Sequence, residues 1–143
     1  KDQLVYDGTL KSINGFNVKI ERVRKYNKNR CKIKVVLIIP RHIEKALAAF
    51  FKRDRKMKPE IFFETHILSK LTVASILLNT KTRVEIFVSD VKDSSDKLQF
   101  IRLKTSGKRK ILAKNLIETA KTLHEIAKTN NLDVEVNYGS MQI

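Results

Sequence analysis

The stretch from Pro59 to Asn79 places the strongest constraint on the fold, because it reads as one helix that is apolar nearly all round. Ile, Leu, Val and Phe recur along it without leaving a wide polar face, and no glycine interrupts them. A helix of this kind is normally buried on several sides. We therefore expect other parts of the chain to cover residues 59–79 on more than one side.

Two further stretches have apolar residues on one helical face only. Ile43, Leu47 and Phe50 follow the i, i+4, i+7 spacing, which predicts an amphipathic helix over 41–56 with basic residues on its outer side. A similar stripe of leucines predicts a long third helix over 108–130.

Alternation of apolar and polar residues predicts the strands. We expect them at 4–13, 17–25, 31–39, 83–91, 98–105 and 133–138. Asn14-Gly15 and the polar run 26–30 are typical turn sequences, so the first three strands are predicted to form hairpins. In the third strand Val36 and Ile38 make the second face apolar as well, which predicts a strand covered on both sides at that end.

The predicted element order is β-β-β-α-α-β-β-α-β. Strands that come in hairpins and are followed by helices indicate an α+β fold with a mostly antiparallel sheet and three helices. The 143 residues, with only four Gly and two Pro, fit a single domain over 1–143. The chain begins Lys-Asp-Gln without a methionine, so we allow for its being a fragment of a longer protein.

The positive charge of the chain is concentrated. Lys and Arg total 30 against 15 acidic residues, a formal net charge of +15. Residues 19–34 hold eight basic residues against Glu21, and residues 41–58 hold seven against two. A composition bias shared by a whole proteome would spread the excess along the chain. The clustering instead indicates a surface that meets a polyanion.

The predicted basic hairpin over 19–34 and the predicted basic helix over 41–58 are the candidate nucleic-acid contacts. Lys and Arg that bind phosphates release counterions, and an aromatic residue in a basic ribbon, here Tyr26, can stack on an exposed base. The alternative is a solvated edge strand whose lysines prevent aggregation. The candidate contacts are Lys19, Arg22, Arg24, Lys25, Tyr26, Lys28, Arg30, Lys32, Lys34, Arg41, Lys45, Lys52, Arg53, Arg55, Lys56, Lys108, Arg109 and Lys110.

The last three of these residues follow Ser106-Gly107 at a predicted strand-to-helix junction. Free backbone N–H groups and the helix dipole favour anions at such a place. A plain side-chain cap of the helix is the alternative.

Signatures of catalysis and metal binding are absent from the sequence. Cys31 is the only cysteine, and no histidine has the spacing of a metal motif. We expect His66 to be a packed residue and Asp90, with its neighbours at 93 and 96, to be solvated turn residues. A nuclease would need convergent carboxylates, for which Glu60, Glu64 and Asp90 are the candidates.

We therefore expect a nucleic-acid-binding domain that contacts the phosphate backbone and is not an enzyme. The alternative is a protein–protein interaction domain of a larger nuclear or ribonucleoprotein assembly that binds an acidic partner surface. We expect no cofactor, no metal and, because no run of 18 apolar residues occurs, no membrane span. The single cysteine fits an intracellular location, either cytoplasmic or nuclear.

Overall fold

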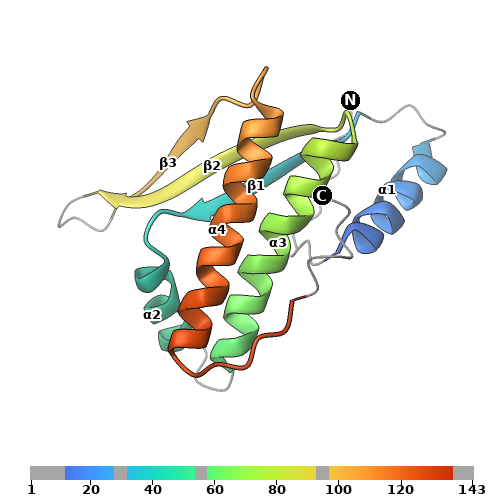
Figure 1. The fold of residues 1–143 in the computed structure, drawn as a ribbon. Helices are drawn as coiled ribbons and strands as arrows, with labels where there is room; N and C mark the ends of the chain where they lie inside the picture. The colour runs from blue at the N-terminus through green and yellow to red at the C-terminus, as the bar shows by residue number, and fades with distance from the viewer. Residues whose placement is uncertain (1–11, 28–31, 54–57, 93–96, 137–143) are drawn as a thin grey trace.

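The computed structural model describes residues 12–27, 32–53, 58–92 and 97–136, and it has an α+β fold (Figure 1). Helices and strands follow the order α-β-α-α-β-β-α. The elements are α1 (Ile13–Asn27), β1 (Lys34–Pro40), α2 (Ile43–Arg53), α3 (Pro59–Asn79), β2 (Arg83–Lys92), β3 (Lys97–Leu103) and α4 (Arg109–Thr129). The predictions for α2, α3 and α4, and for the strands β1, β2 and β3, are confirmed to within a few residues.

The described sheet is mixed, with the strand order β1-β2-β3. β1 and β2 run parallel, with Val35 opposite Val84, whereas β2 and β3 form an antiparallel hairpin with Val88 opposite Ile101. The prediction of a mostly antiparallel sheet is therefore wrong in detail. Since α2 and α3 separate β1 from β2 in the chain, the connection is a crossover, and crossovers join parallel strands.

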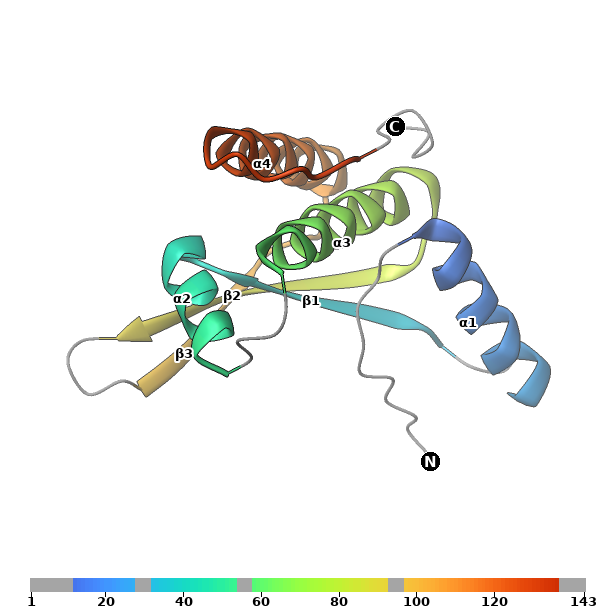
Figure 2. The same cartoon turned by 90° about the horizontal axis from the view of Figure 1, so that it is seen from below.

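The apolar helix α3 is central to the fold, as its sequence predicts. It lies beside α4 along its length, and both helices cover the same face of the sheet (Figures 1 and 2). Its side chains at 67, 71, 73, 74 and 76 are completely buried. By length and composition alone α3 could also cross a membrane, so the sequence excludes a membrane span less firmly than expected. In this fold its apolar surface is used by the core.

Two hydrophobic clusters lie along α3. One joins the helix to the sheet and to Phe16 of α1, and it includes Val35, Val84 and Ile86. The other lies between α3, α4 and α2, and it includes Phe62, Ile67, Leu71 and Leu123 together with Val134 from the segment after α4.

The segment 13–27 is a helix, so the predicted hairpin over 19–34 is wrong. Ser12 explains why: its Oγ accepts a hydrogen bond from the Gly15 amide at 3.0 Å, and its carbonyl accepts one from the Phe16 amide. This is the pattern of a serine N-cap, which satisfies backbone donors at the start of a helix. Phe16 and Ile20, four residues apart, then face the core. Asn14-Gly15 lies in the first helical turn and not in a hairpin turn.

The two outermost predicted strands have different outcomes. Almost all of the strand expected at 4–13 lies outside the described residues. The described part of the strand expected at 133–138, Asp133–Val136, has no regular secondary structure. His124 holds this segment on α4, because its Nε2 donates to the carbonyl oxygen of Val134 at 2.8 Å.

One face of the sheet is not covered by any described helix over its middle (Figure 2). Val36 and Ile38, on that face of β1, are 49% and 53% exposed. The prediction that this end of the strand is covered on both sides is therefore wrong. The helices α1 and α2 lie at opposite ends of β1, and neither covers this surface between them (Figures 1 and 2).

The core helix also buries three polar side chains, Lys70, Thr72 and Ser75. Lys70 is only 2% exposed, and desolvation lowers its pKa from 10.5 to about 8. The Thr72 hydroxyl is buried without a hydrogen-bond partner among the described residues. Burial of such groups costs stability. His66, one turn before Lys70, packs against the Phe62 ring at 4.5 Å, and burial followed by the Lys70 charge lowers its pKa to about 4.

Replacing Lys70 should stabilise the protein at neutral pH. The folded state holds the Lys70 proton less tightly than the unfolded state, so the cost is complete below pH 8 and disappears as pH rises to 10.5. We expect Lys70→Met to raise the free energy of unfolding by on the order of 3 kcal/mol at pH 7 and by less at pH 10.5. Urea titrations at the two pH values test this. The exposed Lys121→Met is the control, and equal effects of the two variants would contradict the account.

Candidate functional site: a basic pocket at one end of the sheet

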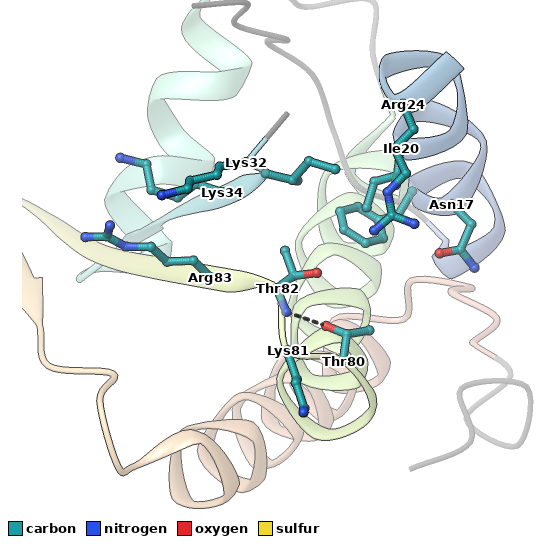
Figure 3. A pocket seen from close by; sticks show the side chains of 11 residues that line it. Asn17, Ile20, Arg24, Lys32, Lys34, Thr80, Lys81, Thr82 and Arg83 are labelled. Atoms are coloured by element: carbon teal, nitrogen blue, oxygen red, sulfur yellow. Dashed lines mark hydrogen bonds between the residues drawn. The ribbon is translucent and has the colours of Figure 1, made fainter. Parts of the chain in front are cut away.

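A cavity of about 760 Å³ lies between α1, the start of β1 and the turn that joins α3 to β2 (Figure 3). Five of its eleven lining residues are Lys or Arg, and none of the eleven is acidic. The lining residues are Phe16, Asn17, Ile20, Arg24, Lys32, Ile33, Lys34, Thr80, Lys81, Thr82 and Arg83. We call this cavity the basic pocket.

The helix α1 supplies an apolar floor and one cation to the basic pocket. Phe16 is buried in the core, Ile20 packs beside it, and Arg24 follows one turn later on the same side. Figure 3 shows the Arg24 side chain alongside Ile20. At 100° per residue, Arg22 and Lys25 lie on the far side of the helix, where both are exposed. The helix therefore divides its basic residues between the pocket and open solvent.

The sheet supplies the opposite wall. Lys34 and Arg83 are register partners on the parallel strands β1 and β2, which places two cations side by side. Lys32 comes two residues before Lys34 and also lines the pocket. Figure 3 shows Lys32, Lys34 and Arg83 extending away from α1. Lys34 and Arg83 share the uncovered face with Val36, because alternate residues of a strand point to the same side. No described carboxylate lies within ion-pairing distance of Arg24, Lys81 or Arg83. These three charges are available to an anionic ligand.

Glu85 lies in the next row of the uncovered face, beyond Lys34 and Arg83. Its two carboxylate oxygens form ion pairs with Lys34 and Arg102, each at 2.7 Å, and these two side chains cover it. The hydrogen bond from Lys34 holds the pKa of Glu85 below its ordinary value, and the Arg102 charge adds to this against an opposing effect of desolvation. Glu85 therefore stays ionised and fixes the direction of both cations.

Arg109 shapes the turn beside the pocket. Its guanidinium donates to four backbone carbonyl oxygens, those of Ile76, Leu77, Thr80 and Thr82, at 2.9 to 3.3 Å. These acceptors include the last turn of α3, where backbone carbonyls lack helical partners and a cation is favourable.

Hydrogen bonds of Thr80 also stabilise the turn. Thr80 donates its hydroxyl to the Ile76 carbonyl and accepts from the Thr82 amide. The positions of Lys81 and Arg83 therefore depend on Arg109 and on this turn.

The predicted contacts divide into groups by position. Arg24, Lys32 and Lys34 come together at the basic pocket. Lys19, Arg22 and Lys25 are exposed on other parts of α1. Lys108, Arg109 and Lys110 lie at the start of α4, next to the turn that Arg109 binds, and Lys108 and Lys110 are exposed. No side chain caps the start of α4, so the alternative of a plain side-chain cap is wrong there.

The basic residues of α2 lie away from the pocket. Arg41 pairs with Asp90 at 3.0 Å, near the end of β2, and His42 lies 3.7 Å from the same carboxylate. Lys45 and Lys52 are exposed on α2, at the end of β1 opposite to α1 (Figure 1). The two predicted basic segments therefore do not form one continuous patch in the described residues.

Some predicted contacts cannot be placed. Lys28, Arg30, Arg55 and Lys56 lie outside the described residues, and so do the side chains of Tyr26 and Arg53.

Sequence reasoning missed Lys81 and Arg83. Residues 59–103 have balanced charge, so net charge per segment does not single out these two residues. The sequence does contain a signal for them, namely a basic turn directly before a buried strand. Such a turn places its cations at one end of the sheet.

The carboxylates needed for a nuclease do not converge on the basic pocket. Glu60 and Glu64 lie in the first turns of α3, whereas the pocket lies beyond the last turn. Asp90 is held by Arg41 and His42. In the described part of the chain, no three His, Cys, Asp or Glu side chains come together as possible metal ligands.

Comparison with known proteins adds no family assignment. No family model matches the chain, and neither a characterised protein nor a solved structure is significantly similar to it.

Loss of the Arg109 contacts should destabilise the fold. Hydrogen bonds to a charged group contribute about 1.5–3 kcal/mol each and are not additive, so we expect Arg109→Ala to lower the free energy of unfolding by about 3 kcal/mol. Chemical denaturation measures the change. The neighbouring Lys110 is exposed, so Lys110→Ala should stay within about 0.5 kcal/mol of the unmodified protein. A loss no larger for Arg109→Ala than for this control would contradict the structural role.

Proposed function

We propose that this protein binds nucleic acid through the phosphate backbone, with the basic pocket as the main contact, and that its role is binding and not catalysis. The observation that carries this proposal is that five of the eleven residues lining one cavity are Lys or Arg and none is acidic, although one of the five, Lys34, pairs with Glu85 outside the lining. Phosphate contacts by Lys and Arg supply most of the sequence-independent affinity of proteins for nucleic acid. The formal charge of +15 favours the approach of a polyanion from a distance.

The layout of the pocket favours an extended polyanion over a single small anion. Its cations come from three separate elements, namely α1, β1 and the turn before β2. Those on the strands extend out of the cavity along the sheet, away from α1 (Figure 3). A chain of phosphates can meet such charges one after another, whereas one compact anion would meet only some of them.

The alternative partner is an acidic protein surface, which would meet the same charges. With nucleic acid, the logarithm of the affinity falls linearly with the logarithm of the salt concentration, by about 0.7 to 0.9 for each phosphate contact. The slope therefore reports how many phosphates the pocket binds.

A charge-matched pair of triple variants tests the proposal. Arg24, Lys81 and Arg83 line the pocket, whereas Arg22, Lys45 and Lys52 are exposed elsewhere, so replacing either set by Ala removes three positive charges. The readout is fluorescence anisotropy of a labelled 20-nucleotide oligonucleotide across a salt series. We expect the pocket variant to lose at least about tenfold in affinity and about 2 in salt slope. The control should lose less than about threefold.

Three results would contradict the proposal. Equal losses in the two variants would mean that only the overall charge matters. An affinity that does not change with salt would exclude phosphate contacts. Failure to bind any oligonucleotide, together with a partner retained after nuclease treatment, would favour the acidic protein surface.

A further inference from the structure

The uncovered face of the sheet carries aromatic side chains next to cations. Phe87 on β2 lies between Ile38 on β1 and Arg102 on β3 in the strand register. In the next row of the same face, Phe100 on β3 lies opposite Ser89. Phe100 is 52% exposed although it is a large apolar residue on a strand. Ile38, Phe87 and Phe100 thus form an apolar surface, which we call the sheet platform.

Cations border the sheet platform, and the one described acid on this part of the face is neutralised. Arg102 lies directly across from Phe87, and Glu85 holds it through a 2.7 Å ion pair. The same carboxylate holds Lys34, so Glu85 is matched by two positive charges. Arg83 adds a third cation beside Lys34. The face therefore carries a net positive charge around two aromatic side chains, of which Phe100 is exposed and Phe87 is half-buried. A nucleic acid complements such a face in both charge and stacking.

The sheet platform continues into the basic pocket. Lys34 and Arg83 line the pocket, and they also share the uncovered face with Phe87, because alternate residues of a strand point to the same side. One row of this face, that of Val36 and Glu85, lies between this cation pair and the row of Phe87. One extended ligand can therefore contact the pocket and the sheet platform together.

From these features we propose that the bound nucleic acid is single-stranded and that its bases stack on Phe87 and Phe100 while its phosphates meet the basic pocket. This inference deepens the proposed function and rests on it. Diagonal positions on neighbouring strands lie about 7–8 Å apart, roughly twice the 3.4 Å rise per nucleotide of a duplex strand. A single strand can splay its bases to that spacing, whereas a duplex keeps them paired inside.

A tryptophan reporter tests the stacking directly. The chain contains no Trp, so Phe100→Trp introduces the only one, on the sheet platform. The neighbouring Ile101→Trp is the matched control, because Ile101 is 46% exposed but lies on the opposite face of the same strand. We expect a 20-nucleotide single strand to quench Trp fluorescence in the Phe100→Trp protein in a saturable way. We expect little change in the Ile101→Trp protein.

Affinity measurements with single-stranded and duplex forms of the same oligonucleotide complete the test. Stacking on an aromatic side chain predicts that Phe100→Ala weakens single-strand binding roughly 5- to 100-fold, whereas Ile101→Ala leaves it unchanged. Duplex binding should be at least about tenfold weaker than single-strand binding. Equal quenching at both positions, or a duplex bound as tightly as the single strand, would overturn the inference.

The failure of this inference is distinguishable from failure of the proposed function. If the pocket variant loses affinity while Phe100→Ala does not, phosphate binding stands and the sheet platform is not used. If neither changes the affinity, both proposals fail. The remaining candidate for covering this face is a second copy of the chain, and light scattering tests for such a dimer. A dimer that Phe100→Ala converts to monomers, and that oligonucleotide does not displace, would also overturn the inference.

Discussion

Burial of α3 determines how the rest of the chain is arranged. Its apolar side chains point in nearly all directions, so it needs the sheet on one side and α4 on another (Figure 2). With α3 and α4 both on one side of the sheet, no described helix remains for the middle of the opposite face. The exposed apolar side chains of that face are therefore a direct result of how the core is built.

The same arrangement concentrates usable charge at one end of the molecule. The last turn of α3, the first turn of α4 and the start of β2 meet where Arg109 binds four carbonyl oxygens. The start of β1 and the side of α1 that carries Arg24 face this region across the basic pocket. At the far end of β1, Arg41 is paired with Asp90. At the pocket end, where the sheet platform begins, Arg24, Lys81 and Arg83 have no described carboxylate within ion-pairing distance.

Part of this fold could be predicted from the sequence because its signals were unambiguous. A long apolar stretch predicted α3, a periodic stripe of leucines predicted α4, and alternation predicted the hairpin of β2 and β3. The segment 13–27 was ambiguous, because Phe16, Ile20 and Val23 fit one helical face while Val18 and Ile20 also alternate. Ser12 decides between the two structures by capping the helix. The Asn14-Gly15 pair that follows it is also typical of a hairpin turn, which favoured the wrong prediction.

The candidate site was less predictable, because it depends on contacts between distant segments. Net charge per segment led to 19–34 and 41–58, but it could not show that α1 directs Arg24 and Arg22 to opposite sides. It also could not show that Arg109 is used in structural hydrogen bonds, or that Lys81 and Arg83 join Lys34 through the parallel register of β1 and β2. That register follows from the crossover, which alternation within a single strand does not reveal.

The most direct test of the central claim is a map of the binding surface. Backbone amide chemical shifts of the isotope-labelled protein would be followed during titration with a single-stranded oligonucleotide. The account predicts the largest changes around Arg24, from Lys32 to Ile38, from Lys81 to Phe87 and around Phe100, with little change along α2. Changes centred on α2 or on the outer side of α4 would contradict the claim that the basic pocket and the sheet platform form the binding surface.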